Sequence, residues 1–258
     1  MILGASSGFG AAASLALARS GYDILGVHLD RRATLPNAER MVAEIRALGR
    51  TALFFNVNAA DPERRLEVIR AFQNETAMRS ADAGIDVLLH SLAFGTLKDF
   101  LAEKPEDAIK PADMNMTLDV MAHSLVYWVQ DLFRTGLLRR GAKIFAMTSA
   151  GGHRIWKTYG AVSAAKAALE SHIRQLAVEL APYEISANAL RAGAADTPAA
   201  RRIPGSERMF AKALEMNPGG RLTAPEDIAE AIVALSACKS SWLTGNVIGV
   251  DGGEDLTG

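Results

Sequence analysis

Short apolar runs alternate with longer amphipathic segments along this chain, and that alternation constrains the fold more than any other feature. Strands are predicted at seven runs: 1–5, 22–29, 51–57, 84–92, 142–149, 184–190 and 246–251. Helical periodicity lies between them, at Phe9–Ser20, Asn37–Leu48, Pro62–Met78, Met114–Leu138, Gly160–Leu180 and Pro225–Cys238. Several strands are continuously apolar, as a parallel sheet covered on both faces requires. The pattern predicts right-handed strand–helix–strand units.

The predicted fold class is therefore α/β, a single doubly wound Rossmann-type domain. A seven-stranded, mainly parallel sheet is flanked by helices, and no linker divides residues 1–258. The first strand is short, so either the true start lies upstream or the strand has only a few residues. Residues 192–222 are rich in proline and glycine, and this long irregular stretch is interpreted as a substrate lid.

Composition excludes several classes of protein. The formal net charge of −1 shows no basic excess for nucleic acid, and no apolar run is long enough to span a membrane. The single cysteine, Cys238, rules out an intrachain disulfide framework and fits a reducing cytoplasm. The histidines are not spaced as a metal set, so no metal is expected.

The loop "LGASSGFG" joins the first strand to the first helix and predicts a dinucleotide site. Gly4 permits the tight turn, while Gly8 and Gly10 allow a pyrophosphate and the helix to approach closely. Backbone N–H groups of the first helical turn then face the phosphates. Ser6, Ser7 and Phe9 complete the expected cofactor-binding loop.

The tip of the second strand bears on which dinucleotide binds. The tip falls near His28, with Asp30 two residues later and then Arg31 and Arg32. Two cations at this place favour the extra phosphate of NADPH, with NADH the less favoured alternative. The competing interpretation is that both arginines belong to a solvated loop. After the third strand, Asn56 and Asn58 are offered for the adenine edge, although Asn58 fits a simple loop cap equally well, and Val57 between them is counted among the cofactor-binding residues.

The segment "TSAGGHRIWKTYGAVSAAK" carries the candidate chemistry. Ser149 ends a central strand, where ligands bind in open α/β sheets. Tyr159 and Lys166 follow, seven positions apart; a Tyr–Lys pair for hydride chemistry is usually four apart, and that position holds Val162. A step of seven puts about 10 Å of helical rise between the two backbones. Tyr159 is therefore expected near or before the start of the helix.

Over nearly its whole length the sequence resembles the short-chain dehydrogenase/reductase family, through the glycine loop, Ser149, Lys166 and "VDGG" at 250–253. It is more closely similar to enoyl-[acyl-carrier-protein] reductases, in which six residues likewise separate the tyrosine and the lysine. In their NADPH-using type III form a serine lies ten residues before the tyrosine, with an arginine like Arg154 between. Met121 occupies the position of the asparagine in the common catalytic tetrad. The enoyl reductases also do without that asparagine.

The resemblance implies site residues and roles. "HSLAFG" places Ser91, Leu92 and Ala93 against the cofactor, and "NALRAGAADTPA" adds Gly193, Ala195 and Thr197. Tyr159 is expected to hydrogen-bond the developing enolate oxygen, with Lys166 holding the nicotinamide ribose and Ser149 assisting. Plain structural roles remain open for each: a surface tyrosine, a solvated lysine and a turn serine.

The leading prediction is NADPH-dependent reduction of the carbon–carbon double bond of trans-2-enoyl thioesters in fatty-acid synthesis. The alternatives are a reductase of ketones or quinones and a catalytically silent NADPH-binding sensor. Arg201, Arg202, Arg208 and Lys212 in the lid are expected to steer an acidic acyl carrier protein, unless they only solubilise a mobile loop. The resemblance also implies a homotetramer or homodimer.

Overall fold

The protein, for which we analysed a computed structural model, has one seven-stranded sheet in the order β3-β2-β1-β4-β5-β6-β7, and the structure describes residues 1–77 and 83–257. The strands are β1 (Ile2–Leu3), β2 (Ile24–His28), β3 (Ala52–Asn56), β4 (Ile85–His90), β5 (Leu138–Ser149), β6 (Ser186–Ala192) and β7 (Val247–Val250). Every neighbouring pair is parallel. The predicted fold class is confirmed.

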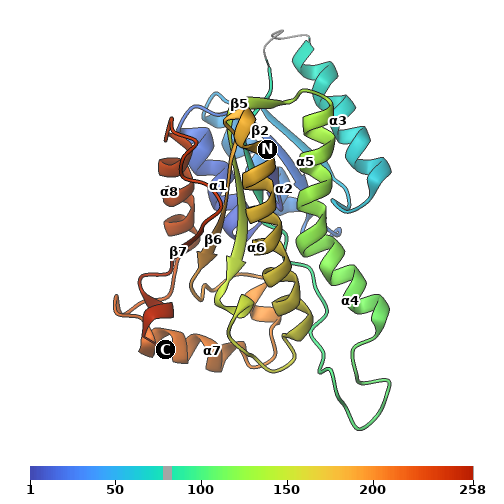
Figure 1. Cartoon of the computed structure of the whole chain (residues 1–258), viewed down its shortest axis with the longest axis vertical. Helices are drawn as coiled ribbons and strands as arrows, with labels where there is room; N and C mark the ends of the chain where they lie inside the picture. Colours follow the sequence, from blue (N-terminus) through green and yellow to red (C-terminus); the bar gives the residue numbers. More distant parts are fainter. Residues whose placement is uncertain (78–82, 258) are drawn as a thin grey trace.

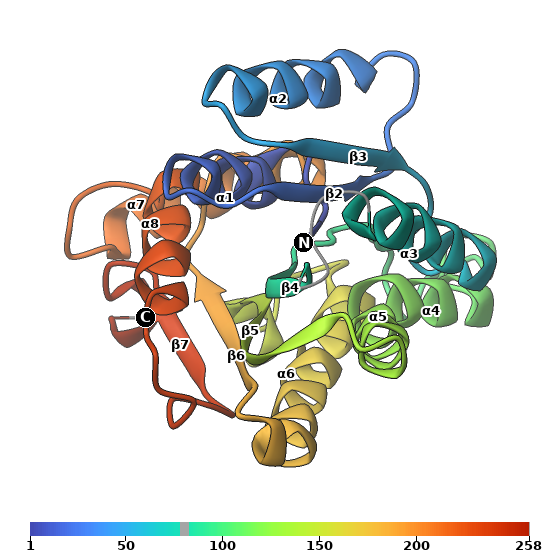
Figure 2. The same cartoon turned by 90° about the horizontal axis from the view of Figure 1, so that it is seen from above.

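Helices cover both faces of this sheet (Figures 1 and 2). They are α1 (Gly8–Arg19), α2 (Leu35–Ala47), α3 (Pro62–Ala77), α4 (Pro111–Leu118), α5 (Ser124–Arg134), α6 (Gly160–Leu180), α7 (Ser206–Met216) and α8 (Pro225–Ser236). One core lies between the sheet and α1, α2 and α8, and includes Leu17, Ile45 and Ile232. The other lies under α3, α5 and α6, around the buried Trp128 and Leu169. The central strands therefore sit between two apolar layers, which explains their continuous apolar sequences, while the edge strands β3 and β7 are only partly buried.

The helix predicted over Met114–Leu138 is wrong in its continuity and its end. A π-helical turn, Asp119–His123, separates α4 from α5. The end of α5 is a glycine cap: Gly136 adopts a positive φ of 68°, and the Leu137 N–H donates to the Leu132 carbonyl at 2.9 Å. Leu137 and Leu138 continue the apolar pattern because β5 begins there, four residues earlier than the predicted start at Ala142.

The proposed lid region is less irregular than the sequence indicated, because it contains α7. Gly205, with a φ of 76°, begins this helix, and the Pro218–Gly219 pair follows its end. Proline and glycine here delimit a short helix rather than forbid one. The predicted end of α3 at Met78 lies outside the described residues. Within the residues that the structure describes, no helix is long and apolar enough to cross a membrane.

Candidate active site

The carboxyl ends of the central strands meet at one cavity of about 380 Å³. Loops after β4, β5 and β6 and the region of α7 enclose it. The sequence-predicted residues on its wall are Phe9, Ser91, Leu92, Ala93, Ser149, Tyr159, Lys166, Gly193, Ala195 and Thr197. Met121, Val162 and Trp156 also line it, so the wall is mostly apolar. Such a cavity suits a ligand with a hydrophobic body and a few polar groups.

The glycine loop is built by backbone packing. A β-carbon added to Gly10 would lie 2.0 Å from the Gly4 carbonyl oxygen, and one added to Gly4 would lie 2.4 Å from the Ser91 carbonyl oxygen. Gly8 differs, because its nearest neighbours are side-chain atoms of Thr197 at 3.7 Å and beyond. Gly10 and Gly4 therefore hold the loop against the sheet, while Gly8 has an open face beside Thr197. Ser6 is buried and Ser7 is exposed.

A hydrogen-bond network occupies the tip of β2. The Asp30 carboxylate meets His28 Nδ1 at 2.8 Å, and the Asn56 side chain bonds the Asp30 backbone through both its oxygen and its nitrogen. Burial acts to raise the pKa of Asp30, but hydrogen bonds from Thr34, Ser6 and His28 outweigh it and lower the pKa. Asn56 thus shapes this tip, and its neighbour Val57 packs against the core.

Arg31 and Arg32 are exposed next to that network. Among the described residues neither of them takes part in an ion pair. Both guanidinium groups are therefore available to an anionic group bound at the end of β2.

Tyr159 is the N-cap residue of α6, directly before the first helical residue, Gly160. Burial raises the pKa of its hydroxyl, so the group is a neutral donor at pH 7. The Ser149 hydroxyl lies close enough to offset part of that rise, yet Ser149 Oγ has no hydrogen-bond partner of acceptable geometry among the described residues. Tyr159 and Ser149 both line the cavity, and each hydroxyl can donate a hydrogen bond to an oxygen of a ligand. Two such donors are what a developing anionic oxygen needs.

The backbone before Tyr159 is strained. Thr158 has a φ of 66°, in the left-handed region that a β-branched residue avoids, and its Oγ1 is buried without a partner among the described residues. Such strain persists only where the surroundings fix it, and it is common at functional sites. The strained Thr158 sets where the chain enters α6, and so where Tyr159 lies.

Lys166 lies two turns into α6 and is buried. Its Nζ donates to the Met147 carbonyl at 2.6 Å, which leaves two of its hydrogens for other acceptors. Burial lowers the pKa of Lys166 to about 8, and the negative charge of Glu170 acts in the opposite direction. The ammonium can therefore hold ligand hydroxyls, as a nicotinamide ribose would offer, and the glycine loop and Thr197 also fit a dinucleotide.

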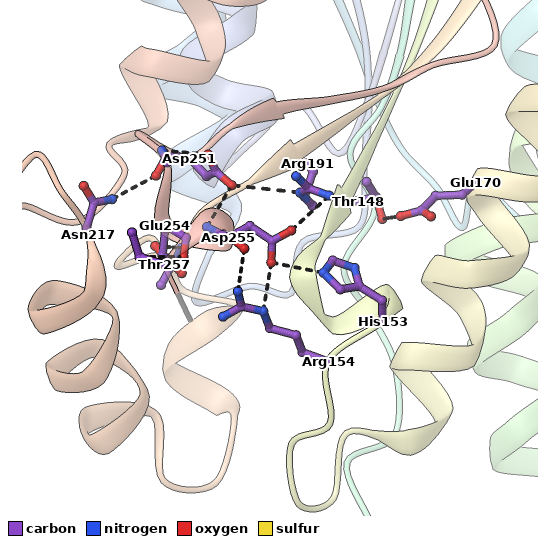
Figure 3. Close-up of polar contacts among 12 residues, drawn as sticks. Thr148, His153, Arg154, Glu170, Arg191, Asn217, Asp251, Glu254, Asp255 and Thr257 are labelled. Carbon is purple, nitrogen blue, oxygen red and sulfur yellow. Dashed lines mark hydrogen bonds and ion pairs between the residues drawn. The ribbon is translucent and has the colours of Figure 1, made fainter.

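An acidic residue that the sequence reasoning missed fixes the loop between Ser149 and Tyr159 (Figure 3). Asp255 accepts from Arg154 Nε at 2.8 Å and from His153 Nε2 at 3.0 Å, and it also meets Arg191 Nη1 at 3.1 Å. Its backbone carbonyl accepts a further bond from Arg154 Nη2 at 2.8 Å. Asp255 therefore links that loop to Arg191 of β6. No sequence pattern indicated this role, because the contacts depend on the tertiary structure.

The cations of the predicted lid are not equivalent. Arg201 forms a bidentate ion pair with Asp196, with distances of 2.5 and 2.7 Å, so its charge is locally balanced. Arg202 and Lys212 line the cavity instead, and Arg208 is exposed on α7. The residues that the structure describes hold no cluster of three or more potential metal ligands.

Comparison with known proteins identifies the family. A family model described as enoyl-(acyl carrier protein) reductase matches residues 4–254 of the chain. The chain belongs to this family. It is thus an oxidoreductase of the short-chain dehydrogenase/reductase superfamily, and the recognition made from the motifs is confirmed.

Relatives within the superfamily differ in what they act on. The chain is 30% identical to a 1-cyclohexenylcarbonyl-CoA reductase from Streptomyces collinus, over 98% of this chain and 85% of the relative. It is 28% identical to a 3-oxoacyl-[acyl-carrier-protein] reductase from Thermotoga maritima, over 98% and 96%. An Anaplasma phagocytophilum enoyl-(acyl-carrier-protein) reductase in complex with NAD matches the fold with a TM-score of 0.81 at 18% identity, over 100% and 92%. This short-chain reductase therefore has relatives named for 1-cyclohexenylcarbonyl-CoA and relatives named for 3-oxoacyl groups.

Proposed function

We propose that this reductase transfers hydride from NADPH to the carbon–carbon double bond of trans-2-enoyl thioesters. The observation that carries the proposal is the placement of Tyr159 at the N-cap of α6, beside Ser149 and over a mostly apolar cavity. In an enoyl thioester the hydride goes to C3, and the carbonyl oxygen lies two bonds beyond C2. A proton donor at the N-cap of α6 suits an oxygen at that distance. In a conjugated thioester the carbonyl oxygen that gains charge lies at that greater distance from the hydride acceptor.

The chain's own residues have distinct tasks in this proposal. NADPH, when bound, supplies a hydride to C3, and C2 then takes up a proton that comes from solvent through Tyr159. Tyr159 donates a hydrogen bond to the carbonyl oxygen as negative charge develops on it, and Ser149 Oγ provides a second contact. Lys166 holds the ribose hydroxyls and favours anionic species through its charge. The apolar wall around Met121 and Val162 keeps water from the reacting carbons.

The preference for NADPH is supported by the two exposed arginines. Arg31 and Arg32 follow β2 directly, and neither has an ionic partner among the described residues, so a 2′-phosphate finds two cations there. Asp30 is held by His28 Nδ1, and the backbone around it is held by Asn56. NADH remains the alternative cofactor, and the ratio of kcat/KM for the two nucleotides decides between them.

Partners are proposed on the same basis. Arg202, Arg208 and Lys212 give the lid a positive face that suits an acidic acyl carrier protein.

A homodimer or homotetramer is proposed through α5 and α6, where Val178 is 72% exposed and Phe133 packs edge-on against the half-exposed Tyr183. Light scattering of the purified protein measures the assembly.

One experiment separates the candidate functions. The protein is mixed with NADPH and, in parallel, with crotonyl-CoA, crotonyl carrier protein, acetoacetyl-CoA or a quinone, and NADPH oxidation is followed. Turnover of the crotonyl thioesters supports the proposal. Turnover of acetoacetyl-CoA or quinone alone makes the protein a ketone or quinone reductase, as the Thermotoga maritima relative favours. Tight NADPH binding without any turnover makes it a silent sensor.

Reversing the charge of Arg202 tests the carrier protein as partner. In Arg202→Glu, the KM for crotonyl carrier protein is expected to rise about tenfold, because one repulsive charge at a protein interface costs on the order of 1.4 kcal/mol. The KM for a short N-acetylcysteamine thioester should rise by less, because that substrate tests only the cavity that Arg202 also lines. Arg201→Glu is the matched comparison, since Arg201 is already paired with Asp196. Equal KM values in wild type and Arg202→Glu would remove the carrier protein from the proposal.

A further inference from the structure

Glu170 lies one helical turn beyond Lys166 on α6, and nothing in the sequence patterns assigned it a role. Its Oε1 accepts a hydrogen bond of 2.6 Å from the hydroxyl of Thr148, which is buried directly before Ser149 (Figure 3). A β-carbon added to Gly152 would lie 3.1 Å from the same oxygen. The carboxylate is therefore hydrogen-bonded to the end of β5 on one side and lies close to the loop that follows Ser149 on the other.

Lys166 meets the same strand end from the same helix. Its Nζ bonds the Met147 carbonyl, so Lys166 and Glu170 contact consecutive residues of β5, Met147 and Thr148. These two contacts attach one face of α6 to the strand end that carries Ser149. Loss of either one would free the other to shift.

The electrostatic surroundings of Lys166 single out Glu170. On β4, burial and then the charge of Lys166 lower the pKa of His90 to about 3, so this ring is neutral. At the start of α6, burial raises the pKa of Tyr159, which is also neutral at pH 7. On β5, Met147 and Thr148 carry no charge. Glu170 is the group, among the described residues, whose charge favours the protonated lysine.

We propose that Glu170 is a positioning residue of this active site, which, held by Thr148, keeps Lys166 charged and against the end of β5. The inference deepens the proposed function and rests on the assigned role of Lys166, not on the identity of the substrate. Its first readout therefore uses the protein without substrate. If no acceptor is reduced, the proposed function fails while this readout still decides the role of Glu170.

The decisive variant is Glu170→Gln, which keeps the shape and the amide oxygen that Thr148 needs but removes the charge. The titration of Lys166 is followed by NMR of ¹³C-labelled lysine side chains, with the signal assigned from Lys166→Arg. We expect the titration midpoint to fall by about one unit or more, which is a tenfold change in the protonation equilibrium. The alkaline limb of kcat/KM should move to lower pH by the same amount, because kcat/KM reports groups of the free enzyme. At pH 6 the variant should keep at least half of the wild-type rate.

Two further variants keep the test decisive. Glu179→Gln removes an exposed charge from the same helix and should leave both profiles unchanged; among the described residues, Glu179 accepts a hydrogen bond from Gln175. Thr148→Val keeps the charge of Glu170 but removes its hydrogen-bond donor, and should lower the titration midpoint of Lys166 less than Glu170→Gln does. If Glu170→Gln does not fold, Thr148→Val alone provides the test. An unchanged Lys166 midpoint in Glu170→Gln, or in Thr148→Val when that variant stands alone, overturns the proposal. A uniform loss of rate without a shifted pH profile overturns it as well.

Discussion

Tyr159→Phe is expected to lower kcat/KM for a crotonyl thioester by about 10²–10³-fold, the usual cost of removing one preorganised donor to a developing anionic oxygen. The ring that remains still packs against the core, and Phe keeps the contact with Gly151, where an added β-carbon would meet the Tyr159 ring at 2.5 Å. NADPH affinity and thermal stability should therefore stay at wild-type values. Steady-state kinetics with NADPH, together with fluorescence titration of NADPH, measures both.

Tyr127→Phe is the matched control for that experiment. The Tyr127 hydroxyl donates to Asp119 Oδ1 at 2.9 Å, and Tyr127 does not line the cavity. Its removal should change kcat/KM by less than twofold. If Tyr159→Phe keeps more than a third of the wild-type activity, the donor must be another group. Ser149→Ala then becomes the variant to measure.

Gly10→Ala is expected to destabilise the protein by about 3 kcal/mol, at the upper end of the cost of overpacking. The added carbon would lie 2.0 Å from the Gly4 carbonyl oxygen, and neither backbone can move without disturbing β1. For a domain of this size the melting temperature should drop by about 10 °C. Chemical denaturation and calorimetry of the variant measure the loss.

Gly8→Ala separates folding from cofactor binding. The added carbon finds ordinary contact distances to Thr197, but the positive φ of 55° at Gly8 costs about 1 kcal/mol for any other residue. Its stability loss should be well below that of Gly10→Ala, while NADPH affinity falls because the open face of the loop is filled. A Gly10→Ala protein as stable as wild type would contradict the packing described for the loop.

The periodicity of apolar residues predicted the bounds of a helix correctly where that periodicity is unbroken and ends at clear breaks. The helix predicted at Gly160–Leu180 has those bounds in the structure, because small and apolar residues repeat at helical spacing between two clear breaks. The same periodicity failed around Asp119–His123, since a π-helical turn keeps the helical appearance of a sequence. The same periodicity also placed the predicted end of this helix beyond Gly136, because the apolar residues that follow belong to β5.

The candidate site was predictable where chain order dictates position. In a parallel sheet, residues after strand ends gather at one edge, so Ser149 and Ser91 were placed near one another by topology alone. The partners of those residues were not predictable. Glu170 and Thr148 are separated by 22 positions, and no local pattern joins them. Asn56 shows the same limit, because its bonds to Asp30 depend on the register in which β3 pairs with β2.

The attachment of Arg154 to Asp255 also has a consequence for how the molecule is made. The two residues are 101 positions apart, so the carboxylate leaves the ribosome long after the loop between Ser149 and Tyr159 has been synthesised. During that interval β1 to β5 can already pair, while this loop still lacks its anchor. A growing chain should therefore acquire its nucleotide-binding half first and its reactive centre last. Half-made copies of the protein would have the glycine loop in place while the loop before Tyr159 still lacks its anchor, Asp255.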